Sequence, residues 1–187
     1  MDFFECASVT LTACRAVLAR LTVDDLARPS PCAEYTVGEV GEHVVRSMVL
    51  LASVAGGAGS AGPVAGLLDE RVGVTGEAAL AAWRRRGLGG SVPVGRSTLP
   101  AGLAAEIIPL ELLVHGWDLA RATGSEIDVA PEVADYMLGQ ARLLITPDKR
   151  GRSFAAEVPA GPSATALERL IAFTGREPLF AVSRRSR

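Results

Sequence analysis

The segment from Glu111 to Gly124 constrains the fold more than any other part of the chain. It reads Glu-Leu-Leu-Val-His-Gly-Trp-Asp-Leu-Ala-Arg-Ala-Thr-Gly, and helical residues four positions apart lie on one face, so Glu111 and His115 share a face. Apolar side chains continue that face on both sides of the pair, namely Ile108, Leu112, Leu119 and Ala122. Burying an unpaired carboxylate costs several kcal/mol or leaves it neutral. The segment therefore predicts a buried helix whose acid requires a partner from elsewhere in the chain.

The available partner is His43, because the chain has two histidines in all. Two imidazoles and a carboxylate form the ligand set of some catalytic zinc sites, which keep a further position open for water or substrate. The same donors also suit ferrous iron or nickel. In this interpretation Glu111 and His115 bind the ion from one helix and His43 binds it from another. The alternative is a helical ion pair between Glu111 and His115, with His43 as a hydrogen-bonded core residue.

Three more residues are candidates for supporting roles. Asp118 follows His115 by three positions, so it is placed to orient the free ring nitrogen of that histidine, or instead to bond a neighbouring loop or Arg121. Arg46, one turn beyond His43, and Arg84 are candidates for holding an anionic substrate. The alternative for Arg84 is that its run of three arginines forms a solvated helix end.

Composition favours packed helices over a β-sandwich, because hydrophobic residues make up 49% of the 187 residues and aromatic residues only 5%. We expect one domain over residues 1–178 and a flexible tail over 179–187. Six helices are predicted from apolar periodicity, caps and prolines, over residues 2–21, 36–54, 76–86, 100–123, 131–144 and 163–175. Residues 56–63, 88–98 and 146–162 are predicted to connect them as irregular loops, with a short strand as the alternative within 88–98. The fourth helix is expected to kink at Pro109.

Charge and hydropathy exclude several partners. A net charge of −2 gives no broad positive field for nucleic acid. The longest apolar run, near residues 44–57, is interrupted by Arg46 and is too short to span a membrane. The first residues lack a basic region and a cleavage site, and we expect a cytoplasmic protein with reduced cysteines. Cys14 is expected to be a buried apolar residue, whereas Cys32 lies in a loop with no assigned role.

Two segments carry a resemblance to a known family. Residues 31–43, Pro-Cys-Ala-Glu-Tyr-Thr-Val-Gly-Glu-Val-Gly-Glu-His, and residues 111–124 resemble the N-terminal domain of mycothiol-dependent maleylpyruvate isomerases, within the DinB-like superfamily of metal-binding four-helix bundles. Residues 167–178 are similar to the end of an actinobacterial single-domain branch. The resemblance implies a four-helix bundle, here with an extra short helix. It also implies a divalent metal, zinc first, at His43, Glu111 and His115.

The resemblance further implies mycothiol as a thiol cosubstrate. The expected function is an S-transferase or isomerase that attacks a small electrophile through a metal-bound thiolate. The chain is too short for the second domain of the isomerase, and Tyr35 stands where the family often has tryptophan, so a different substrate is expected. A non-catalytic bundle that binds a ligand or a metal, and a hydrolase that activates metal-bound water, are the alternatives. A homodimer is one of the oligomeric states left open.

Overall fold

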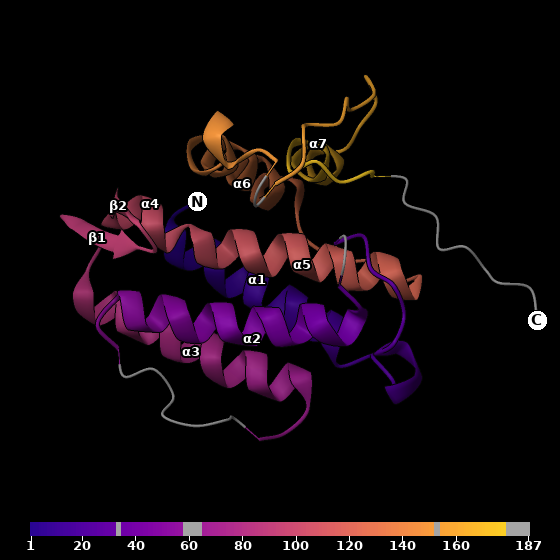
Figure 1. The fold of residues 1–187 in the computed structure, drawn as a ribbon, viewed down its shortest axis with the longest axis horizontal. Helices are drawn as coiled ribbons and strands as arrows, with labels where there is room; N and C mark the ends of the chain where they lie inside the picture. The colour runs from indigo at the N-terminus through magenta and orange to yellow at the C-terminus, as the bar shows by residue number, and fades with distance from the viewer. Residues whose placement is uncertain (33–34, 58–64, 152–153, 179–187) are drawn as a thin grey trace, which may run out of the picture.

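Four long helices form a bundle around one core (Figure 1). The computed structural model describes residues 1–32, 35–57, 65–151 and 154–178. The bundle helices are α1 (Phe3–Leu18), α2 (Val37–Val54), α3 (Leu68–Arg86) and α5 (Ile107–Thr123). Helix α1 packs against α3 and α5, and α2 packs against the same two helices, so the four helices close a ring. The predicted all-α class is confirmed.

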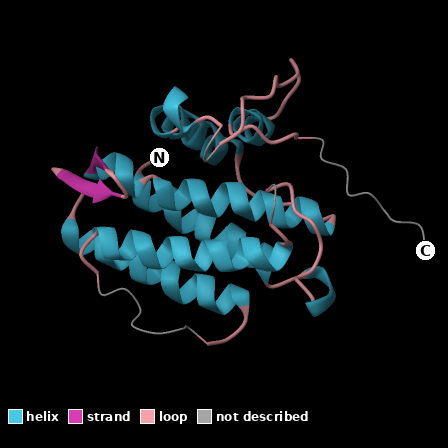
Figure 2. Ribbon diagram, viewed as in Figure 1, coloured by secondary structure: helices cyan, strands magenta, loops and turns pink. Residues whose placement is uncertain are grey.

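The remaining elements, all of them short except α6, cap or flank the bundle (Figure 2). They are η1 (Val23–Asp25), β1 (Ser91–Val94), β2 (Ser97–Pro100), α4 (Ala101–Ala105), α6 (Pro131–Leu144), η2 (Pro147–Lys149) and α7 (Ala166–Phe173). The two strands form an antiparallel hairpin in which Val92 pairs with Leu99. Helices α6 and α7 pack against each other, and α6 also contacts α5. The C-terminal third of the chain therefore lies beside the helix that carries Glu111 and His115.

The start of α2 is set by a capping box formed by Thr36 and Glu39. The Thr36 hydroxyl accepts a hydrogen bond from the backbone N–H of Glu39 at 3.3 Å, and the Glu39 carboxylate accepts one from the backbone N–H of Thr36 at 2.8 Å. Helix α5 ends where predicted, at Gly124, whose φ of 72° is left-handed. These two signals determine how His43 and His115 are placed along their helices.

The third helix begins earlier than predicted. It starts at Leu68, and Thr75 is not its N-cap but an internal residue whose hydroxyl donates to the Arg71 carbonyl at 2.8 Å. Threonine is a common N-cap residue, which suggested a helix start after Thr75, but Gly73 and Gly76 lie on either side of it inside the helix. These glycines have a packing role: a Cβ at Gly73 would lie 2.7 Å from the Arg15 side chain, and one at Gly76 would lie 2.6 Å from Leu11. Their missing side chains let α3 approach α1 closely.

The predicted helix over residues 100–123 is divided into α4 and α5 at Glu106. Proline has no N–H, so Pro109 leaves the carbonyl of Ala105 without its helical partner, and α4 ends there. Pro109 then occupies the first turn of α5, where no such bond is required. The expected kink is therefore a break, four residues before Pro109, and Glu111 lies in the second turn of a new helix.

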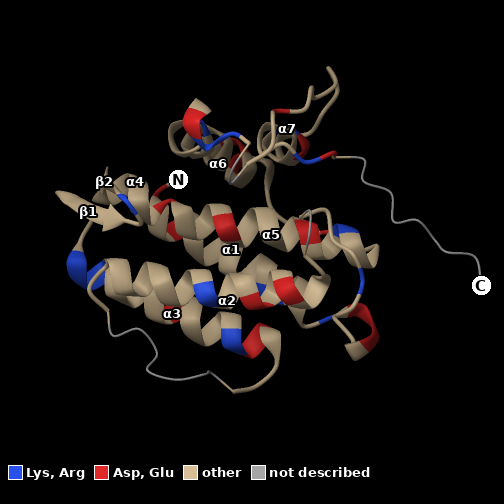
Figure 3. Cartoon of the chain, in the orientation of Figure 1, with Lys and Arg blue, Asp and Glu red and all other residues tan. Residues whose placement is uncertain are grey.

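The last helix is shorter than the predicted range of 163–175, and the predicted tail over 179–187 lies outside the described residues. Most of the predicted loop over 56–63 also lies outside them. Over the part of the chain that is described, acidic and basic residues are interspersed along the helices (Figure 3). None of the described helices has the length and apolar character needed to cross a membrane.

Candidate metal centre

The structure brings His43, Glu111 and His115 together between α2 and α5. The Nε2 atom of His43 lies 2.9 Å from Oε2 of Glu111, and the Nε2 atom of His115 lies 3.6 Å from the same oxygen. The two imidazole rings meet edge to face, with centroids 4.8 Å apart. Two residues from consecutive turns of α5 therefore face one residue of α2, in the arrangement that the spacing predicts.

A serine that the sequence analysis did not single out completes the surroundings of Glu111. The Ser47 hydroxyl donates to Oε2 of Glu111 at 3.0 Å and lies 3.3 Å from Nε2 of His43. Ser47 follows His43 by four positions, so the same helical spacing that pairs Glu111 with His115 would have placed it on this face. It holds the carboxylate in position from the α2 side.

Behind His115 lies a buried chain of charged groups. Its Nδ1 atom is 2.9 Å from Oδ2 of Asp118, which is fully buried. Arg176 donates to both oxygens of Asp118, from Nε to Oδ1 at 2.7 Å and from Nη2 to Oδ2 at 2.9 Å. The hydrogen bond to Asp118 uses Nδ1 of His115, so the other ring nitrogen, Nε2, is the one that faces Glu111. Asp118 thus lies where it orients this imidazole, as one of the two sequence interpretations expects.

Burial and neighbouring charges shift the pKa values of Glu111 and His115 in opposite directions. Burial raises the pKa of Glu111, but the hydrogen bond from His43 and the charges of His115 and His43 outweigh it and lower the pKa to about 2. Burial lowers the pKa of His115, but the contacts with Asp118 and Cys32 and the charge of Glu111 raise it to about 10. Without an ion, His115 therefore carries a proton that stabilises the two carboxylates beside it.

The three donors fit a divalent ion. A tetrahedral zinc site with bonds of about 2.0–2.1 Å places its ligand atoms about 3.3 Å apart. The separations of 2.9 and 3.6 Å bracket that value, and one ligand atom from each of His43, Glu111 and His115 lies within 4.8 Å of the others. The same contacts also make the ion-free cluster that the sequence analysis left open. The cluster also borders a cavity, so an ion held here would keep one position accessible, as catalytic metal sites do.

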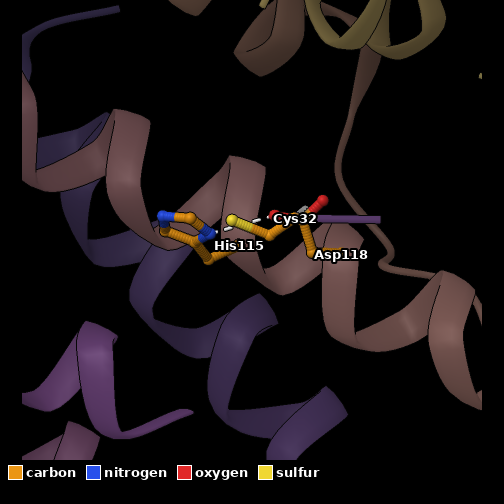
Figure 4. Close-up of side chains that lie close together, drawn as sticks. All are labelled: Cys32, His115 and Asp118. Atoms are coloured by element: carbon orange, nitrogen blue, oxygen red, sulfur yellow. Dashed lines mark hydrogen bonds and ion pairs between the residues drawn. The ribbon is translucent and has the colours of Figure 1, made fainter. Parts of the chain in front are cut away.

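A second group of possible ligands fits less well. Cys32, His115 and Asp118 also have ligand atoms within 4.8 Å of one another, and Figure 4 shows the Cys32 sulfur beside the His115 ring and the Asp118 carboxylate. Both oxygens of Asp118 already accept hydrogen bonds from Arg176, with Nε of Arg176 only 2.7 Å from Oδ1. The positive charge of this guanidinium would repel a cation bound to Asp118. We therefore place the candidate ion on the Glu111 side of His115.

The candidate centre opens into a cavity of about 510 Å³. Its walls include apolar side chains from α5, namely Ile107, Leu110 and Val114. The C-terminal third of the chain adds Leu144, Lys149, Phe154 and Arg176, and the loop before α2 adds Cys32 and Tyr35. A volume of this size suits a small organic molecule.

The two arginines proposed as substrate contacts do not line this cavity. Arg46 is exposed on α2, and Arg84 is exposed at the end of α3 with its guanidinium 5.3 Å from the centre of the Phe4 ring. Arg84 thus packs on α1 instead of facing His43. The cations of the cavity wall come from later in the chain. Neither Lys149 nor Arg176 was singled out from sequence, because no local pattern links them to residues more than 30 positions away.

The cysteines divide into two kinds. Cys6 and Cys14 are fully buried, which confirms Cys14 as an apolar core residue, and burial raises the pKa of each thiol to about 12. Cys32 is half-buried, and it lines the cavity beside His115. The loop cysteine is therefore the one that a molecule in the cavity would meet.

Ion binding at this centre is expected to strengthen with rising pH. A histidine ligand must be neutral, and with a pKa of about 10 His115 keeps its proton over the neutral range until the ion displaces it. Glu111 is already ionised there, so binding releases the His115 proton, and this release alone should raise the apparent affinity about tenfold per pH unit between about pH 7 and 9. Calorimetry in buffers of different ionisation heat measures both quantities. An affinity that does not change over this range would contradict the assignment of His115.

Fold and site together define a class: a helical bundle with a candidate His-Glu-His metal centre on two adjacent helices. Comparison with known families makes this specific, because the model of the mycothiol maleylpyruvate isomerase N-terminal domain matches residues 10–120, and the chain belongs to that family. The family is metal-binding and mycothiol-related. The matched range includes all of α2 and α3, parts of α1 and α5, and the three candidate ligands.

The chain is also similar to uncharacterized proteins from two strains of Mycobacterium tuberculosis. Each is 31% identical over 169 residues, which cover 86% of this chain and 90% of the relative. No solved structure gives a significant match. The similarity to these relatives extends beyond the family match, into the C-terminal third that supplies part of the cavity wall.

Proposed function

We propose that this protein is a metal-dependent enzyme that uses mycothiol to modify a small electrophile, as an S-transferase or an isomerase. One observation carries the proposal: in a member of a mycothiol-related family, His43, Glu111 and His115 converge at the wall of a cavity. Zinc is the proposed ion, and nickel and ferrous iron suit the same donors. A divalent ion in this position lowers the pKa of a coordinating thiol, which supplies a thiolate near neutral pH.

The chain's own residues prepare the site for that chemistry. Asp118 holds the His115 ring so that Nε2 faces the centre, and Arg176 holds Asp118 in position through two hydrogen bonds. Ser47 fixes the oxygen of Glu111 that both histidines approach. Apolar side chains of α5 line the space where thiol and electrophile would meet.

The test is turnover by protein that is purified without an affinity tag and supplied with zinc. Mycothiol is incubated with two electrophiles, an aryl halide and an α,β-unsaturated ketone, and thiol consumption is measured. We expect consumption that requires mycothiol and is abolished by a chelator. A Cys32→Ser variant should retain turnover. This result would distinguish turnover of mycothiol from alkylation of the protein's own thiol in the cavity.

Two results would contradict this function, and each points to an alternative. A protein that binds the ion but consumes no thiol with either electrophile is a binding bundle. Chelator-sensitive turnover of an ester or amide without any thiol indicates hydrolysis through activated water. In both cases the candidate ligands would stand, and only the chemistry assigned to them would change.

A further inference from the structure

The cavity wall contains the only lysine of the chain. Of 19 basic residues 18 are arginines, and the exception is Lys149, the last residue of η2. It lies far from the candidate ligands in sequence and outside the range that the family model matches, yet it lines the same cavity as His43 and Glu111. The ligand centre and this lysine therefore line one cavity from two parts of the chain.

Lys149 has donors to spare. Its Nζ atom donates to the carbonyl of Leu144 at 2.8 Å, and an ammonium group has three N–H donors. Among the described residues, no ion pair includes Lys149. The other cation of the wall is neutralised, because Arg176 binds both oxygens of Asp118. Lys149 is a partly buried positive charge that forms no ion pair with a described carboxylate, and such a charge favours an anionic ligand.

The rest of the wall limits what that ligand is. Side chains from α5 (Ile107, Leu110 and Val114) and from the C-terminal third (Leu144 and Phe154) present apolar surface. Such surface favours an apolar body but gives no partner to a second charged group. The cavity of about 510 Å³ is large enough for a ring with a short chain.

We propose that Lys149 anchors a single carboxylate and that the cavity takes a small monoanion with an apolar or aromatic body. This inference deepens the proposed function, because the monoanion would be its electrophile, but the binding step does not depend on turnover. It assigns to Lys149 the anion-holding role that Arg46 and Arg84 are not placed to fill. A small dianion without an apolar body is expected to bind poorly.

The experiment uses the zinc-loaded full chain, labelled with ¹³C at the lysine Cε, so that the spectrum contains one lysine side-chain signal. Cinnamate and cinnamamide have the same apolar body and differ in charge, and succinate is the dianion. No thiol is added. We expect cinnamate to shift the Lys149 signal and to bind about tenfold more tightly than cinnamamide, with succinate weaker than both.

Variants test whether Lys149 is the residue that gives the preference for cinnamate over cinnamamide. Lys149→Met should abolish the advantage of cinnamate while cinnamamide affinity and zinc content stay unchanged, and Lys149→Arg should keep most of it. Arg142→Met, which removes an exposed positive charge of α6 outside the cavity wall, is the matched control and should change nothing. If Lys149→Met does not fold, the wild-type shift and the Lys149→Arg variant still decide the question.

Equal binding of cinnamate and cinnamamide would overturn the inference. The inference would also be overturned if Lys149→Met still bound cinnamate more tightly than cinnamamide and if cinnamate did not shift the lysine signal of the wild-type protein. The carboxylate would then be bound by the ion itself. Since binding is measured without thiol, neither result bears on thiol transfer. Conversely, a protein that consumes no thiol can still show the Lys149-dependent preference.

Discussion

A Glu111→Gln variant is expected to lose the divalent ion that the wild-type protein retains. The substitution keeps the size of the side chain but removes the negative charge of the oxygen that His43, His115 and Ser47 all approach. Loss of partners outside the ligand shell costs metal sites about 10–100-fold in affinity, so loss of a ligand charge should cost at least about 100-fold. Competition with a chelator, followed by metal analysis, measures the change.

The matched control makes the same chemical change on the facing helix. Glu42 precedes His43 on α2, but its carboxylate pairs with Arg71 and does not reach the centre. A Glu42→Gln variant should therefore bind the ion as the wild type does. If Glu111→Gln holds a full equivalent of metal, the carboxylate is not a ligand, and the ion-free cluster of Glu111 with His43 and His115 is the correct interpretation.

An Asp118→Ala variant is expected to lose about 3–5 kcal/mol of unfolding free energy, the largest effect on stability that we predict. Asp118 is fully buried and accepts hydrogen bonds from Arg176 and His115. Its removal leaves the guanidinium of Arg176, with only 12% of its side chain exposed, without a counter-charge. Urea denaturation in the presence of a chelator measures this cost separately from metal binding.

Asp135→Ala provides the comparison, because it also removes an aspartate that pairs with an arginine. Asp135 and Arg169 are 55% and 44% exposed, and an ion pair in solvent contributes about 0–1 kcal/mol. We therefore expect Asp118→Ala to be several-fold more costly. Similar losses in the two variants would mean that the Asp118–Arg176 pair does not tie the C-terminal segment to α5 as the structure indicates.

Local signals predict much of the fold, and packing explains the errors. The capping box at Thr36 and the glycine at position 124 correctly place the ends of two helices, because caps act over a few residues. The start of α3 was wrong, because Thr75 has the residue type of an N-cap but lies inside a helix whose Gly73 and Gly76 pack against α1. Pro109 was correctly taken as a disruption, but the break occurs four residues earlier, at the carbonyl that proline leaves unbonded.

The candidate site divides in the same way. Glu111, His115 and Asp118 lie within eight residues of one helix, so helical spacing relates them, and His43 follows because no third histidine exists. Arg176 lies 58 residues from Asp118, and Lys149 and Phe154 reach the cavity only through the packing of the C-terminal third beside α5. No periodicity encodes such contacts, and for this reason the cations of the wall were sought at Arg46 and Arg84.

The most direct test of the metal centre is to locate the ion in crystals of protein purified without an affinity tag and supplied with zinc. Anomalous diffraction at the zinc edge should give one peak about 2.0–2.2 Å from Nε2 of His43, a carboxylate oxygen of Glu111 and Nε2 of His115. A peak between Cys32 and Asp118, or no peak at full zinc saturation of the solution, would contradict the site described above.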